Sequence, residues 1–239
     1  MSAIALHGRP SSGYDQKLAA TQNVLRQAGE LYQPLTQASS LGVEDMVITH
    51  LLSALGVKSE VFVLQTGKLH AQTTDLLHTM QKQFGSQRTI RIHEPDAQAA
   101  SAFEAEHGKD AMYKSIALRK QCCDIRKMQP LALALDGKRA WITGLRKEQS
   151  DARAAVHAID DSATPVKINP LHDWLLGDVW HYVKTNAVPY NSLHDQFYPS
   201  IGCEPCTRAV TLGEDFRSGR WWWENESAKE CGLHVATSA

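Results

Sequence analysis

Short extended runs alternate along the chain with helical segments, and this alternation limits the fold more than any other feature of the sequence. The apolar run at residues 61–66 (VFVLQT) ends at a Thr-Gly pair and is followed by a helical segment at 68–85. The same order recurs with an alternating run at 88–95 and a helical segment at 97–108. Strands separated by helices favour a mostly parallel sheet with helices on both faces, so the sequence predicts an α/β fold.

The remaining periodic segments are helical at 14–32 and 172–186 and extended at 139–145 and 164–171. After Pro189 the sequence is rich in turn formers and shows no clear period. A length of 239 residues suits one large domain with an appendage. We therefore predict an α/β domain at residues 1–189 and an irregular C-terminal segment at 190–239.

The charge balance argues against partners that bind through a general electrostatic field. Lys and Arg number 25 against 26 for Asp and Glu, which gives a formal net charge of -1, so no nucleic acid and no membrane is expected as a partner. The N-terminus has no basic region followed by an apolar run, and no apolar stretch approaches about 20 residues. We therefore expect a cytoplasmic protein in which any anion site is local.

A small-residue loop before a helix is the first candidate for such a site. Ser39, Ser40 and Gly42 directly precede an apolar helical run. Free backbone N–H groups at a helix start can bind an anion, and glycine allows close approach. The spacing differs from that of a Walker loop, and the same residues also suit an ordinary helix cap. Glu44 and Asp45 have a plain interpretation as favourable charges in the first helical turn.

Two close cysteine pairs form the second candidate site. Cys122 and Cys123 are adjacent, and Cys203 and Cys206 form a Cys-x-x-Cys motif. Four thiolates can hold either tetrahedral zinc or an iron-sulfur cluster, because both prefer soft sulfur ligands. An adjacent pair chelates one zinc ion awkwardly, whereas a cluster offers each sulfur its own iron. The pattern therefore favours iron-sulfur over zinc.

Other interpretations of these cysteines stay open. Cys203 and Cys206 have the spacing of a thioredoxin-like dithiol, although that motif should follow a strand and open a helix, and here it follows irregular sequence. The pairs also suit buried structural thiols. Lys127 either offsets negative charge on the sulfurs or is a solvated helical lysine.

Cys231 is left over once the other four cysteines are paired. Basic residues lie near it in the sequence, namely Arg208, Arg217, Arg220, Lys229 and His234. Nearby positive charge lowers a thiol pKa from about 8.5 and makes the nucleophilic thiolate available, and arginine forks suit sulfate and phosphate oxygens. The alternatives are that these side chains are simply solvated and that Cys231 is incidental. The tryptophans at 221–223 favour an anchoring role over base binding.

In combination, these motifs resemble the assimilatory adenylyl-sulfate (APS) reductases of bacteria, the iron-sulfur branch of the PAPS/APS reductase family. The matching stretches run in family order over about residues 39–234 and are SSLGVEDMV, LQTGKL, CCDIRKMQPL, TGLRKEQSDAR, GCEPCTRAV, GEDFRSGRWWWE and KECGLH. The ECGLH tail together with both cysteine pairs is the most specific part. Leu41 and Gln65 depart mildly from the family pattern, in which phenylalanine and aspartate are common.

The resemblance implies an adenine-nucleotide alpha-hydrolase-like (PP-loop) fold and a 4Fe-4S cluster on Cys122, Cys123, Cys203 and Cys206. It also implies that Cys231, on a mobile C-terminal tail, attacks the sulfur of adenosine 5'-phosphosulfate, so that AMP leaves and an S-sulfocysteine remains. Reduced thioredoxin then releases sulfite, as in the assimilatory route to cysteine. Reduction of PAPS is the alternative within the family, and a zinc-stabilised nucleotide-binding protein without redox activity is the alternative outside it.

By the same resemblance, the anion-binding residues near the sulfate and phosphate are Lys127, Arg217 and Arg220, with Arg146 as a further candidate. The residues that line the nucleotide site are Ser39, Ser40, Gly42 and Glu44, with Thr66, Gly67 and Leu69 on a neighbouring loop. The expected partners are the nucleotide and reduced thioredoxin, and a homo-oligomer is compatible with the sequence.

Overall fold

A six-stranded sheet lies at the centre of the computed structural model, which describes residues 2–211 and 213–224. Its strands are β1 (Leu35–Ser39), β2 (Glu60–Leu64), β3 (Ile90–His93), β4 (Ala140–Ile142), β5 (Ile159–Asp160) and β6 (Val166–Ile168). Their order is β3-β2-β1-β4-β6-β5, and only the pairing of β5 with β6 is antiparallel among these strands. The predicted α/β fold with a mostly parallel sheet is therefore confirmed.

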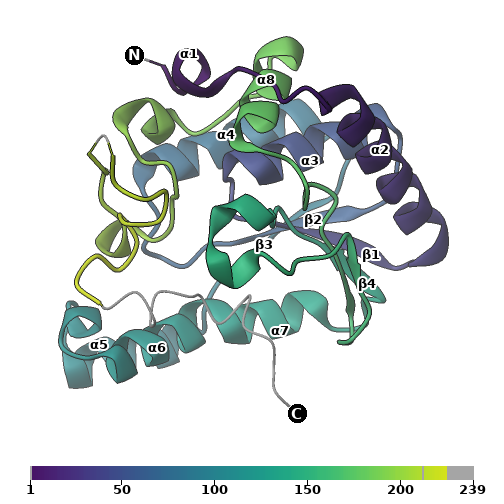
Figure 1. Cartoon of the computed structure of the whole chain (residues 1–239). Helices are drawn as coiled ribbons and strands as arrows, with labels where there is room; N and C mark the ends of the chain where they lie inside the picture. Colours follow the sequence, from purple (N-terminus) through teal and green to yellow (C-terminus); the bar gives the residue numbers. More distant parts are fainter. Residues whose placement is uncertain (1, 212, 225–239) are drawn as a thin grey trace.

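Helices cover both faces of this sheet (Figure 1). One face carries α2 (Tyr14–Leu31), α3 (Val43–Ala54), α4 (Ala71–Phe84) and α8 (Leu176–Asn186), with α1 (Ala3–His7) packed on α8, and the other side carries α5 (Ala97–His107), α6 (Ile116–Cys123) and α7 (Gln129–Leu135). Strand β2 shows why both faces are apolar. Val61 and Val63 belong to the large core under α3 and α4, whereas Phe62 packs with Leu131 of α7 and Trp141.

Among the described residues, no helix is both long enough and apolar enough to span a membrane.

The strand order reverses at β1, and this reversal fixes where a ligand can bind. Strand β1 pairs with β2 on one side and with β4 on the other, and all three run parallel. Open α/β sheets bind ligands outside the carboxyl ends of the strands at such a switch point. The loops that leave this edge begin at Ser40 after β1 and at Thr143 after β4.

Most predicted elements are confirmed within a few residues, and the differences have local causes. The extended run at 139–145 is strand only over Ala140–Ile142, because Gly144 turns the chain across the start of α3. The helix predicted at 172–186 begins at Leu176, because the carboxylate of Asp178 accepts the backbone N–H of Leu175 at 2.9 Å and caps the first turn. Strand β1 and helices α6 and α7 were not among the predicted elements.

The described part of the C-terminal segment is irregular, as the sequence predicts. It contains only the short 3-10 turns Ser192–Gln196 and Glu204–Cys206 as helical structure over residues 190–211 and 213–224. Isolated bridges join Leu69 to Cys203 and Thr207 to Arg220. This segment is therefore held by single contacts and side chains instead of by a continuous ladder.

Candidate active site

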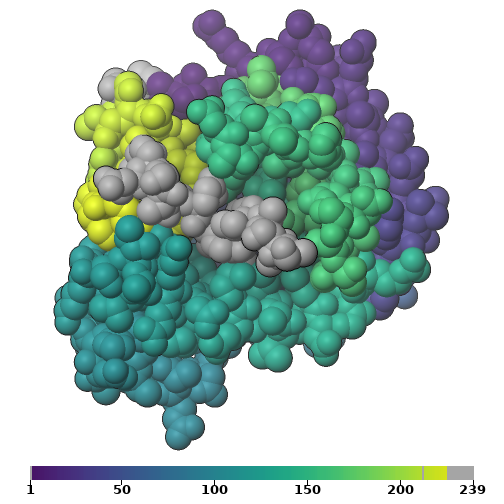
Figure 2. Space-filling model, turned by 60° about the horizontal axis from the view of Figure 1, so that its bottom comes forward, coloured from purple at the N-terminus to yellow at the C-terminus, as the bar shows by residue number. Residues whose placement is uncertain are grey.

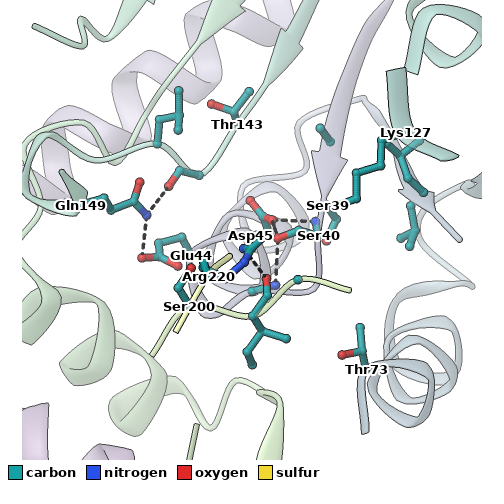
Figure 3. A pocket seen from close by; sticks show the side chains of 18 of the residues that line it. Ser39, Ser40, Glu44, Asp45, Thr73, Lys127, Thr143, Gln149, Ser200 and Arg220 are labelled. Carbon is teal, nitrogen blue, oxygen red and sulfur yellow. Dashed lines mark hydrogen bonds between the residues drawn. The ribbon is translucent and has the colours of Figure 1, made fainter. Parts of the chain in front are cut away.

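A pocket of about 200 Å³ opens where the loops after β1 and β4 meet the C-terminal segment (Figure 3). The residues predicted for substrate binding that line it are Ser39, Ser40, Gly42, Glu44, Thr66, Leu69, Lys127, Arg217 and Arg220. Arg217 and Arg220 come from the segment after Pro189, and the others come from the α/β domain. The structure thus brings both parts of the chain to one cavity, and the two predicted residues that lie elsewhere are Gly67 and Arg146.

The loop between β1 and α3 forms a tight turn at the edge of this pocket. Leu41 is buried and has a left-handed backbone, with φ of 62°. Both the backbone N–H and the hydroxyl of Ser40 donate to Oδ2 of Asp45 at 2.7 Å, and these bonds are drawn in Figure 3. Gly42 is the N-cap of α3, and no side chain caps this helix start. The turn therefore leaves the helix N-terminus available to an anion.

Asp45 joins the two loops that flank the switch point. Burial raises the pKa of this carboxyl to about 6, although the hydrogen bonds from Ser40 oppose the rise. A Cβ at Gly144 would lie 2.5 Å from Oδ1 of Asp45 and 2.8 Å from Cβ of Glu44. Glycine is thus required at position 144, because any side chain would separate the loop after β4 from the start of α3.

Arg146 lies behind Glu44. Its side chain is 1% exposed, and its Nε and Nη2 atoms lie 3.0 Å and 2.9 Å from Oε1 of Glu44. Glu148 binds Nη1 at 2.6 Å, and Gln149 donates to Oε1 of Glu44 at 3.0 Å. Burial by itself raises the pKa of Glu44, but the charge and hydrogen bonds of Arg146 and the bond from Gln149 hold it below its usual value.

The contacts of Arg146 indicate a role in holding Glu44. Two carboxylates already neutralise its guanidinium, and its side chain is directed to them. Arg146 therefore acts on the pocket through Glu44, which it keeps ionised and fixed. The direct contact with a substrate anion that the sequence suggests for Arg146 stays a prediction.

The two cysteine pairs, far apart in the sequence, meet at one small cavity. Cys122 and Cys123 end α6, directly before a π-helical turn at Asp124–Met128. Cys203 and Cys206 flank the turn of the Cys-x-x-Cys motif, and all four are free thiols. The cavity is lined by these cysteines together with Lys68, Met112, Arg119, Arg126 and Lys127. Four sulfurs thus share one site with four cationic side chains.

Burial and nearby charges shift the pKa values of three of the four thiols. Burial, with the nearby Cys203, raises the pKa of Cys206 to about 12, and burial also raises the pKa of Cys122. At Cys203, burial is outweighed by the charge of Lys127 and a hydrogen bond from Thr66, so its pKa falls below its usual value. Burial therefore favours the neutral thiol at Cys122 and Cys206, whereas the nearby charge of Lys127 favours the thiolate at Cys203.

Within residues 2–211 and 213–224, no group of three or more His, Cys, Asp or Glu side chains is arranged to hold a metal ion. The four cysteines line one cavity, and the metal that they would hold stays a prediction from the sequence. The Cys-x-x-Cys motif also opens a 3-10 turn and no α-helix, unlike a thioredoxin-like dithiol.

The loop after β2 connects the thiol site to the pocket. The hydroxyl of Thr66 lies 3.3 Å from Sγ of Cys203, and Arg126 donates to the carbonyl of Thr66 at 2.7 Å. Gly67 has φ of 72°, and a Cβ there would lie 3.1 Å from Nη1 of Arg126, so its part is to let the loop turn. Lys127 lines both cavities. The two cavities therefore share Lys127 and are joined by the contact of Thr66 with Cys203.

The tryptophans after the second cysteine pair anchor the segment, in agreement with the sequence interpretation. Trp221 is 1% exposed, and the guanidinium groups of Arg119 and Arg220 lie over its ring at 4.8 Å and 4.7 Å from the centroid. Trp223 packs against Tyr113 with ring centroids 4.5 Å apart. Cys231, the predicted nucleophile, lies outside the described residues, as do Lys229 and His234.

Several pocket residues were not predicted from the sequence. Gln149 and Arg153 line the pocket and lie in the stretch TGLRKEQSDAR, so the resemblance already contained the signal for them. His194 and Phe216 also line it, but they come from the aperiodic segment. His194 is 7% exposed, and its Nδ1 lies 2.9 Å from the carbonyl oxygen of Tyr198. No local pattern marks such a residue.

A family model and the most similar sequence relatives point to the same protein family. The model of the phosphoadenosine phosphosulfate reductase domain matches residues 34–209. The chain is 47% identical over 223 residues to an adenosine 5'-phosphosulfate reductase of Burkholderia cepacia, covering 92% of this chain and 88% of that protein. It is 44% identical over 218 residues to the adenosine 5'-phosphosulfate reductase of Allochromatium vinosum, with 90% and 84% covered.

Solved structures agree with these sequence relatives. The phosphoadenylyl-sulfate reductase of Candida auris, in a phosphate complex, superposes with a TM-score of 0.68 at 29% identity, over 80% of this chain and 90% of that one. An FMN adenylyltransferase of Candida glabrata superposes with a TM-score of 0.59 at 12% identity, over 95% of this chain and 80% of that one, and so shares the fold alone.

Proposed function

The chain belongs to the phosphoadenosine phosphosulfate reductase family, and from this premise we propose that it reduces adenosine 5'-phosphosulfate to sulfite and AMP with reduced thioredoxin as electron donor. The observation that carries the proposal is the meeting of two cysteine pairs beside the pocket, with Lys127 lining both cavities. The relatives at 47% and 44% identity, which are named as reductases of this nucleotide, support the substrate.

The proposed chemistry balances with two thiol steps. The Cys231 thiolate attacks the sulfur of the nucleotide, the bond from sulfur to the phosphate oxygen breaks, and AMP leaves with the electron pair. A thioredoxin thiolate then attacks Sγ of the resulting S-sulfocysteine, and sulfite leaves with the bonding pair. The second thiol of thioredoxin resolves the mixed disulfide and frees Cys231. Thioredoxin thereby supplies both electrons.

The pocket residues have distinct parts in this proposal. The turn from Ser39 to Gly42 and the N-terminus of α3 bind the nucleotide phosphate. Arg217, Arg220 and Lys127 counter the charge of the sulfate and of the leaving phosphate. Arg146 holds Glu44 in place.

A 4Fe-4S cluster is the cofactor that we propose for the thiol site, held by Cys122, Cys123, Cys203 and Cys206. Four soft donors around one cavity, three of them buried, are the observation in its favour. Bound there, the cluster would supply fixed charge and local rigidity next to Lys127. The electrons for sulfite formation are already accounted for by thioredoxin.

The alternative within the family is reduction of the 3'-phosphorylated nucleotide, PAPS. It is favoured by the name of the matching family model and by the Candida auris structure. We also retain as proposals a cytoplasmic location, a nucleotide-binding domain at 1–189, and a C-terminal segment at 190–239 that carries the tail cysteine. A homo-oligomer is compatible with all of these.

The test of the function compares the two nucleotides and then follows the thiol. Steady-state sulfite formation with thioredoxin should be far faster with adenosine 5'-phosphosulfate than with PAPS. Cys231→Ser should bind the nucleotide and form no sulfite. Intact-mass analysis without reductant should show a sulfonate adduct on wild type, and incubation with AMP is the control. A preference for PAPS would overturn the substrate, and absence of the adduct would overturn the nucleophile.

A further inference from the structure

A buried ion pair lies at the end of the described chain. Arg119 of α6 donates from Nε and Nη2 to the two carboxylate oxygens of Glu224 at 2.9 Å and 2.6 Å. Each side chain is 2% exposed. The pair joins helix α6 to the last described residue, and in Figure 2 the described residues of the C-terminal segment (yellow) border the teal surface of α5 and α6. Such a two-pronged bond fixes orientation as well as distance.

Arg119 is also the centre of a chain of contacts between the two sites. Its guanidinium hydrogen-bonds the thiol of Cys123 and lies 4.8 Å from the ring centroid of Trp221. The guanidinium of Arg220, which lines the nucleotide pocket, lies 4.7 Å from the centroid of the same ring. The position of Glu224 is therefore coupled to the thiol site through Arg119 and to the pocket through Trp221 and Arg220.

A second ion pair in the same segment shows what burial adds. Arg208 and Glu214 also form a two-pronged bond, at 3.0 Å and 2.6 Å, but their side chains are 37% and 29% exposed. Exposed pairs contribute little, whereas burying a pair costs desolvation that is offset only by good geometry. A buried ion pair therefore adds little net stability to the folded state. Its value at Arg119 and Glu224 is the fixed placement of the chain.

We propose that Arg119 and Glu224 are positioning residues that fix the start of the tail carrying Cys231 relative to the nucleotide pocket and the thiol site. The proposal rests on the proposed function for the role of Cys231. That cysteine follows Glu224 by seven residues, which span at most about 25 Å when extended. A fixed origin limits the space that the thiol samples and raises its effective concentration at the bound nucleotide. A loosened origin lowers that concentration without removing a substrate contact.

The kinetic test uses Glu224→Gln, which keeps the shape of the side chain and removes its charge, with Glu214→Gln as the matched control. Sulfonation of Cys231 is followed by mass in a single turnover, and nucleotide affinity is measured in a Cys231→Ser background. Glu224→Gln should slow sulfonation at least about tenfold with affinity within about threefold and iron content unchanged. Glu214→Gln should match wild type in sulfonation rate, nucleotide affinity and iron content.

Hydrogen exchange provides a readout that needs no turnover. The amides of Trp221 and Glu224 donate to the carbonyls of Cys206 and Trp221 at 3.2 Å and 2.9 Å. Their exchange should become at least about tenfold faster in Glu224→Gln, with the amides of β1 and β2 unchanged. Arg119→Lys should give an intermediate effect, because an ammonium keeps the charge and loses the two-pronged geometry.

The outcomes separate the inference from the function. Unchanged exchange at Trp221 and Glu224, or unchanged sulfonation, would overturn the positioning role. Equal losses of rate, affinity and iron would also overturn it, because they indicate general unfolding. A wild type that forms no sulfonate refutes the proposed function, and the exchange measurement then still decides whether the pair anchors the segment.

Discussion

The nucleotide pocket and the thiol site are neighbours built in different ways. The pocket is formed by loops that leave two adjacent parallel strands, over a core in which Val61, Val63 and Ile142 are fully buried. The thiol site is formed by the end of α6, a π-helical turn and a 3-10 turn, and it is held by Arg119, Trp221 and their partners. The geometry of the pocket therefore follows from sheet topology, and that of the thiol site depends on a few side chains and the group that they bind.

The largest expected effect tests whether the two regions fold separately. Cys206→Ser removes one of the four thiols from the cavity. We expect most of the iron and sulfide to be lost and sulfite formation to fall at least about 100-fold, because cluster ligands are needed together. Far-UV circular dichroism should retain the helices and strands of the α/β domain, whose core does not include this cavity. Iron analysis and circular dichroism on the same sample measure both results.

Glu204→Gln is the control for this change. The side chain of Glu204 is exposed within the same motif, and its contact with Lys68 is made by its backbone N–H at 2.7 Å. The control should keep its iron. Retention of iron by Cys206→Ser would contradict the cluster assignment, and loss of the helical signal would show that the two regions form one folding unit.

An intermediate effect is expected from the electrostatics of the pocket. Arg146→Ala leaves Glu44 buried without its main partner, so the free energy of unfolding should fall by about 3–5 kcal/mol. Arg91→Ala breaks the pair with Glu60 at a side chain that is 59% exposed, and it should cost less than about 1 kcal/mol. Urea unfolding of both variants measures the difference. Equal stabilities would show that Glu44 does not depend on Arg146.

The difference between the two regions also explains how much the sequence could predict. The helix start at Gly42 and the strand at β2 follow from apolar periodicity and small residues, and both are confirmed. Strand β1 was missed because its sequence LTQAS is half polar, and its place in the sheet comes from neighbours on both sides. Its polar side chains are satisfied by tertiary contacts, such as the bond from Gln37 to the carbonyl of Asp45 at 2.8 Å.

For the candidate site, the sequence predicted which residues take part better than it predicted which side chains they contact. The cysteine spacing identified all four thiols of the cavity, since the chemistry of sulfur makes such pairs stand out. The partners of Arg146 could not be predicted, because a sequence shows an arginine on a loop and not the carboxylate of Glu44 behind it. The contact of the Arg119 guanidinium with the Trp221 ring joins residues about 100 positions apart, and no local pattern encodes it.

The smallest expected effect concerns backbone strain where the irregular segment turns toward the pocket. Phe197 has φ of 64° after the turn Ser192–Gln196, and its ring is 43% exposed. A left-handed backbone costs a non-glycine residue about 1–2 kcal/mol. Phe197→Gly should therefore be more stable than Phe197→Ala by about 1 kcal/mol, since both lose the ring and only glycine relieves the strain. Thermal unfolding of the two variants compares them directly.

At an ordinary helical position, replacing alanine by glycine should lower the stability instead of raising it, and this provides the control. Ala102 is exposed in the middle of α5, and Ala102→Gly should lose about 1 kcal/mol, because glycine gives up more backbone entropy in a helix. If alanine is also the better residue at position 197, the left-handed turn does not persist in solution. The segment would then approach the pocket by a different path, and Arg217 and Arg220 would reach it without that turn.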